Sequence, residues 1–436
     1  MADIVPFRAL RYDPKRAPAS QVVTQPYDKI TPAMQDRYYS ASPYNLVRII
    51  LGRRDPEDNT GQSVYTRAAE YFREWRSLGI LHQDSTPCLY AYSQRFTAPG
   101  TGAELERRGF IALGRIEDYS AKVVFRHEQT LAKPKADRLE LLRATRAHFE
   151  QLFMLYEDSG EIDSQLSTAT AEPAAIEVTD EYGVSNRVWQ ISDSRLIDFI
   201  RGQMRKQKLI IADGHHRYET ALNFRNELRA GGAQAASADP APWEYVVMTF
   251  VNVNSPGLLI LPTHRVVHSL ASFSADDFQN ASRALFAVEE IDPALDAARA
   301  TSILRTKGEA GTALLAVAAN RAFLLHKPKP EGSQFLAGLS EGQRSLDVVQ
   351  LHKCVLEGVL HLSEESIRNQ ENISYIRDAA EALALVRAGK ANVAFLMNPC
   401  RVQQVRDLAL AGEVMPQKST DFYPKLLSGL TIYALD

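Results

Sequence analysis

The chain has 436 residues, of which 45% are hydrophobic and 24% charged, a composition that suits roughly two to four folded domains and excludes global disorder. Its formal net charge of -3 shows no excess of Lys and Arg, which argues against nucleic acid as the main partner. No apolar stretch reaches the length of a membrane span, so we expect a protein that spans no membrane. The N-terminus has no signal-peptide run and the three cysteines form no CxxC pair, so we expect the cytoplasm as its compartment.

Short apolar runs alternate with amphipathic segments through the first half of the chain. The periodicity predicts strands over 46–51, 89–96, 109–118 and 152–156, and helices over 62–81, 134–148 and 192–203. It also predicts a hairpin in which strands 174–178 and 187–191 flank Asp180-Glu181-Tyr182-Gly183. A buried strand over 208–212 then precedes Asp213-Gly214, and a helix over 218–230 follows. Residues 231–242 are rich in Ala, Gly and Pro and predict a mobile surface loop before a strand over 245–253.

The texture changes from about residue 273, so we place a domain boundary within 269–274. Beyond it the pattern predicts helices over 275–286, 293–306, 345–360 and 375–388 and strands over 312–318, 322–326 and 391–397. No regular βαβ rhythm demands a doubly wound sheet. The fold class is therefore α/β in the mixed α+β sense.

The segment Asp213-Gly214-His215-His216-Arg217 has the strongest chemical signal. A glycine after a buried strand allows a sharp turn, and the first amides of the next helix point at an incoming anion. Arg217 can bind phosphate oxygens in a fork, His215 and His216 can donate hydrogen bonds or exchange a proton, and Asp213 could hold Mg²⁺ or orient a histidine. The alternative is a simple N-cap with two surface histidines.

A second polar segment runs from Phe125 to Arg138. In it Glu128 could serve as general base for a hydroxyl nucleophile, with His127 as the less favoured candidate. Lys133 and Arg138 could neutralise phosphate charge. A solvated loop followed by a charged helix face explains the same composition equally well.

A third polar segment, Met415 to Lys425, lies between apolar residues near the C-terminus. Such a loop could reach back to the active site and bring Lys418 or Ser419 to a ligand. A structural turn is the alternative.

Three stretches, IADGHHRYETAL, HEQTLAKPKADRLELLRATRAHFEQLFMLY and GEVMPQKSTDFYPKLLSGL, together resemble the bacterial and archaeal family called domain of unknown function 1015. The strand, glycine turn and basic helix start also resemble, more distantly, the fold shared by ParB, sulfiredoxin and the free-serine kinases. In sulfiredoxin a cysteine does the chemistry at the position held here by His215, so sulfinic-acid reduction is implausible. The ParB group has a Glu and paired Arg in its turn, which this chain lacks.

This second resemblance implies a ParB/sulfiredoxin-like core over 1–270 and a C-terminal α+β domain over 271–436 that contributes a loop to the site. It also implies nucleotide-dependent phosphoryl transfer, with ATP or ADP and Mg²⁺, to or from a small hydroxylated metabolite. L-serine or phosphoserine is the best guess for that metabolite, since members of the unknown-function family 1015 are often encoded beside serine-biosynthesis enzymes. The expected roles divide the residues named above into two groups: catalytic Glu128, His127, Asp213 and His216, and phosphate-binding Gly214, His215, His216, Arg217, Lys133, Arg138, Lys418 and Ser419.

Two other functions remain open at the sequence level. One is a nucleotide-binding regulator or DNA-associated switch of the ParB type, and the other is a phosphatase or hydrolase that uses the same phosphate pocket. The sequence does not specify an oligomeric state.

Overall fold

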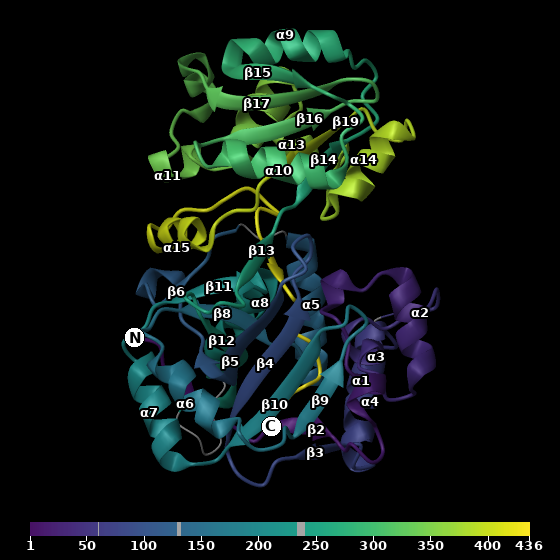
Figure 1. Ribbon diagram of the computed structural model, residues 1–436. Coiled ribbons are helices and arrows are strands. Elements are labelled where there is room, and N and C mark those ends of the chain that lie inside the picture. Colours follow the sequence, from purple (N-terminus) through teal and green to yellow (C-terminus); the bar gives the residue numbers. More distant parts are fainter. Residues whose placement is uncertain (60, 129–131, 233–239) are drawn as a thin grey trace. The chain divides into compact units, whose positions relative to one another are not determined.

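The computed structural model describes residues 1–59, 61–128, 132–232 and 240–436, without the side chains of 132–134. The chain divides into two units, coloured along the sequence in Figure 1. Unit 1 comprises Met1–Arg126, Thr130–Leu259 and Pro424–Asp436, and unit 2 comprises His127–Gln129 and Ile260–Tyr423. This division differs from the expected boundary at 270/271, because the C-terminal segment returns to unit 1.

Unit 1 is built on a nine-stranded mixed sheet with the order β6-β11-β8-β12-β5-β4-β10-β9, and β1 pairs with β5. The strands are β1 (Ile4–Val5), β4 (Leu89–Thr97), β5 (Glu104–Arg115), β6 (Val124–Phe125), β8 (Leu152–Tyr156), β9 (Ile176–Thr179), β10 (Ser185–Ile191), β11 (Leu209–Asp213) and β12 (Tyr245–Asn252). The pairs β6/β11 and β8/β12 are parallel, and the other pairs are antiparallel. The strands predicted over 89–96 and 109–118 are present and pair with each other, and the predicted hairpin is confirmed.

The helices of unit 1 bury two apolar clusters. They are α1 (Ala19–Val22), α2 (Pro32–Ala41), α3 (Val47–Ile50), α4 (Val64–Ser77), α5 (Ala132–Thr145), α6 (Glu161–Ala169), α7 (Ser194–Met204) and α8 (His215–Ala230). The larger cluster joins one face of the sheet to α6, α7 and α8. Figure 1 shows α6 and α7 beside each other. The second cluster joins α3, α4 and α5 through residues such as Ile50, Phe72 and Phe149. These clusters fix both ends of the β11–α8 connection.

The C-terminal segment is tied into unit 1 by backbone pairing. Its strand β21 (Tyr433–Ala434) pairs with β7 (Ala147–His148), next to the pairing of β2 (Leu10–Tyr12) with β3 (Leu81–Gln83). Isolated bridges join Ser428 to Thr24 and Ile432 to Leu10. Residues just after 423 are thereby held against the core of unit 1.

The strand predicted over 46–51 is wrong, because this run forms the short helix α3. Asn45 accepts a hydrogen bond from the Val47 amide at 3.0 Å and starts the turn. Val47, Ile49 and Ile50 are all buried, and the half-buried Arg48 is the one polar residue of the run. A run this short and this apolar cannot be assigned to strand or helix by periodicity.

Unit 2 contains a six-stranded antiparallel sheet with the order β15-β17-β16-β19-β14-β18. Its strands are β14 (His264–Val267), β15 (Phe286–Ile291), β16 (Ala313–Val317), β17 (Ala322–Pro328), β18 (Ile373–Ile376) and β19 (Val393–Met397), and β13 (Leu259–Leu261) pairs with β20 (Asp421–Tyr423). Its helices are α9 (Ala275–Leu285), α10 (Ala297–Gly308), α11 (Glu341–Arg344), α12 (Asp347–Val349), α13 (Glu364–Asn369), α14 (Ala379–Arg387) and α15 (Val402–Leu410). The predicted α+β character of this half is confirmed.

Two helix predictions in unit 2 need correction. The helix predicted over 345–360 is α12 followed by a π-helix, Gln350–Val359. The helix predicted from residue 375 begins only at Ala379, after the Asp378 N-cap, because Tyr375 belongs to strand β18.

Within the predicted loop 231–242, residues 233–239 lie outside the described residues. In the part of the chain that is described, no helix combines the length and apolar content needed to cross a membrane.

The overall class is confirmed as mixed α/β. The finer expectation of a ParB/sulfiredoxin-like core stays a prediction.

Candidate phosphate-binding site

The connection between β11 and α8 is a single glycine turn. Gly214 has φ of 95°, a left-handed conformation that side chains rarely adopt. A Cβ at this position would lie 2.9 Å from Leu152 Cδ2 and 3.1 Å from the Arg217 guanidinium. The helix starts at His215, before the predicted start at 218, and no side chain caps it. Its first amides therefore lack an intrahelical partner and are suited to receive an anion.

Asp213, the last residue of β11, carries two cations on its carboxylate. Arg217 Nη2 lies 2.9 Å from Oδ2, and Lys425 Nζ lies 3.0 Å from Oδ1. Burial by itself raises the pKa of Asp213, but the charges of Lys425 and Arg217 outweigh burial and hold that pKa well below its usual range. Asp213 is therefore ionised at neutral pH and fixes both cations beside the helix start.

Arg217 points inward from the first turn of α8. Its Nη1 donates to the Gln151 carbonyl at 2.5 Å, while Nη2 holds Asp213. Its side chain is 13% exposed and that of Lys425 is 8% exposed, so both cations are largely withdrawn from water. Burial lowers the pKa of Arg217, but the negative charges of Glu150, Asp213 and Asp28 more than reverse this effect. Arg217 thus remains a fixed positive charge.

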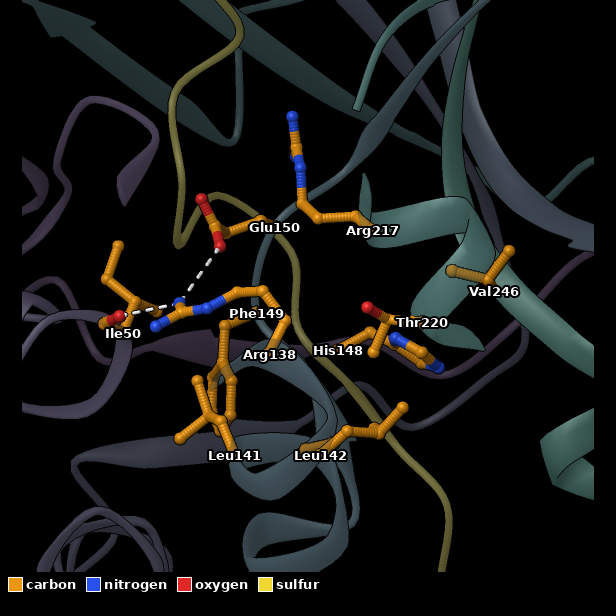
Figure 2. A pocket seen from close by; sticks show the side chains of 11 residues that line it. Ile50, Arg138, Leu141, Leu142, His148, Phe149, Glu150, Arg217, Thr220 and Val246 are labelled. Atoms are coloured by element: carbon orange, nitrogen blue, oxygen red, sulfur yellow. Dashed lines mark hydrogen bonds and ion pairs between the residues drawn. The ribbon is translucent and has the colours of Figure 1, made fainter. Parts of the chain in front are cut away.

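A small cavity of about 50 Å³ lies beside Arg217, with Arg138, Glu150, His148 and Thr220 in its lining. Figure 2 shows the Glu150 carboxylate between the guanidinium groups of Arg138 and Arg217. Arg138 Nη1 lies 3.9 Å from Glu150 Oε2 and donates to the Ile50 carbonyl at 2.7 Å. A cavity of this size admits a few water molecules or one small group.

Glu150, which lines this cavity, also contacts Tyr27. Glu150 Oε1 accepts from the Tyr27 amide at 3.0 Å, and the Arg138 guanidinium lies 4.1 Å from the Tyr27 ring centre. Tyr27 lies in the short 3-10 helix Tyr27–Lys29. Burial, with Asp28 and Glu150, raises the pKa of Tyr27, so its phenol stays protonated. Three segments of unit 1 that are distant in sequence therefore meet at the start of α8.

Among the sequence-predicted residues, the structure brings Asp213, Gly214, His215, His216, Arg217 and Arg138 together in unit 1. His215 is buried and His216 half-buried at the first two positions of α8. The Lys133 side chain lies outside the described residues.

The other predicted residues belong to unit 2, where the second and third polar segments meet. The Lys418 amide donates to Glu128 Oε1 at 2.9 Å, and His127 Nε2 lies 2.8 Å from Thr420 Oγ1. The Ser419 hydroxyl donates to the Pro416 carbonyl, which closes the turn. The backbone of this turn thus orients Glu128. The proposed roles of Glu128, His127, Lys418 and Ser419 stay predictions.

Sequence reasoning missed Lys425, Glu150 and Tyr27. Lys425 ends the third polar segment, which predicted a ligand contact from Lys418 or Ser419 instead. Glu150 lies two residues before the buried strand β8, and Tyr27 lies in a Pro-Tyr-Asp turn. A charged residue at the edge of a buried strand is the one signal that pointed to Glu150.

A magnesium role for Asp213 also stays a prediction. Across the described residues, no group of three or more His, Cys, Asp or Glu side chains lies close enough to form a metal site. Mg²⁺ is often held by one or two carboxylates together with substrate phosphates. Asp213 alone would therefore suffice only for a metal that arrives with a phosphate ligand.

No curated protein matched the chain. Among solved structures, a conserved hypothetical protein from Pyrococcus furiosus is similar at 12% identity and a TM-score of 0.34, over 71% of this chain and 91% of that one. A free serine kinase in complex with AMP is similar at 14% identity and a TM-score of 0.33, over 71% and 89%. SbnI with a C-terminal truncation, from Staphylococcus aureus, is similar at 10% identity and a TM-score of 0.36, over 74% and 87%. Similarity at this level assigns no activity.

The family comparison covers most of the chain. The model described as protein of unknown function (DUF1015) matches residues 4–349, and this chain belongs to that family.

Proposed function

We propose that the start of α8 in unit 1 binds the phosphate groups of a nucleotide, and that the protein transfers a phosphoryl group to or from a small hydroxylated metabolite. L-serine or phosphoserine is the proposed substrate. The observation that carries the proposal is the uncapped helix start at Gly214, flanked by the fixed cations Arg217 and Lys425.

The charge arrangement supports an anionic ligand. Asp213 pairs with two cations, Arg217 and Lys425, which lie next to the helix N-terminus, and Glu150 also acts on Arg217. The helix contributes a further partial positive charge and its first amides. Phosphoryl transfer requires mainly positioning and charge neutralisation, and these groups supply both.

Glu128 remains the proposed general base for the acceptor hydroxyl. The amide of Lys418 donates to one of its carboxylate oxygens and so orients the group that would take the proton. Because Glu128 belongs to unit 2, activity is the measurement that tests its role.

Transfer of labelled phosphate from ATP or ADP to L-serine, with Mg²⁺, tests this proposal. We expect phosphoserine to form with the wild-type protein and to fall at least 100-fold with Glu128→Gln, since general base catalysis contributes roughly 10²–10⁴-fold. Glu128→Gln should leave nucleotide binding intact. Glu365→Gln, at an exposed residue of α13, is the matched control and should keep full activity.

Two results would contradict the proposed transfer. Release of inorganic phosphate without phosphoserine would make water the acceptor and the protein a phosphatase. Nucleotide binding without any turnover would indicate a regulator.

A further inference from the structure

A second cavity lies entirely within unit 2. It opens where β19 ends and continues through Asn398 to Arg401 into α15, next to the end of α10 and the start of α12. Its volume is about 280 Å³. Clefts for drug-sized ligands measure about 300–1,000 Å³, so this cavity suits a smaller metabolite. We call it the Asp347 cavity.

The inner wall of the Asp347 cavity carries a carboxylate held in one position. Polar groups of Ala313, Asn398 and Thr312 lie near the Asp347 carboxylate and act to lower its pKa. Asn398 in turn donates to the Leu304 carbonyl at 2.9 Å. A Cβ on Gly308 would lie only 2.4 Å from Asn398 Nδ2, so the end of α10 packs tightly on this wall. The carboxylate is therefore preorganised rather than mobile.

The rim of the Asp347 cavity carries exposed charges of both signs. Arg305 and Glu309 come from the end of α10, and Arg401 precedes α15. In the described part of the chain, none of these three side chains forms an ion pair with another residue. The exposed guanidinium groups of Arg305 and Arg401 can therefore pair with a ligand carboxylate in the same cavity that Asp347 lines.

Burial provides a second reason why Asp347 suits a cationic group. Burial raises the pKa of Asp347 to about 7, against the lowering effect of its hydrogen bonds and of the Arg401 charge. A buried carboxyl with a shifted pKa beside a cavity is a recognised feature of ligand sites. An ammonium group next to it would stabilise the ionised form and offset part of the cost of burial.

We propose that the Asp347 cavity binds a small zwitterion of the α-amino acid class, whose ammonium pairs with Asp347 and whose carboxylate pairs with Arg401 and Arg305. The cavity is smaller than the usual clefts for drug-sized ligands, and its lining carries charges of both signs, which match the two ends of an amino acid. This site is separate from the proposed phosphate site in unit 1, so each can fail without the other.

Titration calorimetry of the full chain with glycine and L-alanine tests the proposal. Neither amino acid has a hydroxyl group, so neither can act as phosphoryl acceptor. We expect saturable binding of at least one of them to the wild type, and no comparable binding of acetate or methylamine, each of which carries one of the two charges. Loss of one charge-assisted contact should weaken binding at least about tenfold in Asp347→Asn and in Arg401→Gln.

Arg406→Gln is the matched control, because Arg406 lies on α15 outside the cavity lining. It should bind as the wild type does. Arg401 is exposed, so its variant should fold even if Asp347→Asn is unstable. The proposal is overturned if neither amino acid binds, if acetate binds as tightly as alanine, or if folded Arg401→Gln binds as tightly as the wild type.

Discussion

The ammonium of Lys425 lies 3.0 Å from Oδ1 of Asp213, although the two residues are 212 positions apart in the chain. The C-terminal segment of unit 1 thus delivers a buried cation to the glycine turn. Two buried side chains hold that segment: Gln94 Nε2 donates to the Lys425 carbonyl at 2.8 Å, and Arg107 Nη2 donates to the Pro424 carbonyl at 2.5 Å. The proposed phosphate site therefore has Lys425 as its second cation only when the C-terminal segment is docked.

Replacing Lys425 with Met should weaken nucleotide binding by roughly 10- to 100-fold, because a charge-assisted contact contributes about 1.5–3 kcal/mol. Met keeps most of the side-chain volume and removes only the charge. Fluorescence titration with a labelled nucleotide measures the change. Lys206→Met, at an exposed lysine of unit 1, is the control and should bind normally. Equal affinities in the two variants would remove Lys425 from the site.

Replacing Gly214 with Ala should destabilise unit 1 for two separable reasons. A left-handed backbone costs a non-glycine residue about 1–3 kcal/mol, and the new Cβ also crowds Leu152 at 2.9 Å. Gly183→Ala is a matched control, because Gly183 has φ of 77° but no atom within 4 Å of its Cβ position. Urea unfolding should show a larger loss for Gly214→Ala than for Gly183→Ala. Equal losses would mean that the turn tolerates a side chain.

Replacing Asp213 with Asn should cost about 3 kcal/mol of unfolding free energy, because it removes the carboxylate that pairs with the largely buried Arg217 and Lys425. The folded-state pKa of Asp213 is depressed, so its contribution is present above the unfolded pKa of about 4 and is lost as the pH falls below that value. Denaturant unfolding at pH 7 and pH 3 should therefore show a smaller difference between variant and wild type at pH 3. A difference that does not shrink at pH 3 would contradict this assignment.

His148 gives a stability change in a different pH window. Burial lowers its pKa to about 4, so the folded protein keeps the ring neutral where the unfolded chain, with a pKa of about 6.5, takes up a proton. Stability should rise between pH 4 and pH 6.5, by at most about 3 kcal/mol from this group. In His148→Gln this part of the rise should disappear, as unfolding at pH 4.5 and pH 7 would show. An unchanged pH profile would place the His148 pKa near its ordinary value.

The sequence predicted those features that depend on neighbours in the chain. The strand before Asp213, the glycine turn and the following helix are encoded within a few residues, and they were predicted to within a few positions. The approach of Lys425 and Glu150 to that turn depends on packing across long sequence separations, which no local pattern contains. The prediction for 46–51 failed for a related reason, since a short run with one polar residue, Arg48, lacks the periodicity that distinguishes strand from helix.

The polar segments around Glu128 and Lys418 show a mixed outcome. Both were expected near a ligand, and the structure joins them to each other through the Lys418 amide. The residue types suggested that the Lys418 side chain would reach a ligand. They did not suggest that its backbone amide would donate to Glu128. Backbone contacts of this kind depend on turn geometry, here with Lys418 at φ of 56°.

The most direct test of the central claim is calorimetric titration of ATP and ADP, with and without Mg²⁺, into the wild type, Arg217→Ala and Arg205→Ala. Arg205 is an exposed arginine of unit 1 that follows α7 and serves as the matched control. We predict saturable nucleotide binding in the wild type and in Arg205→Ala, and its loss in Arg217→Ala. Undiminished binding to folded Arg217→Ala, or no nucleotide binding to the wild type, would contradict the assignment of the α8 start as a phosphate site.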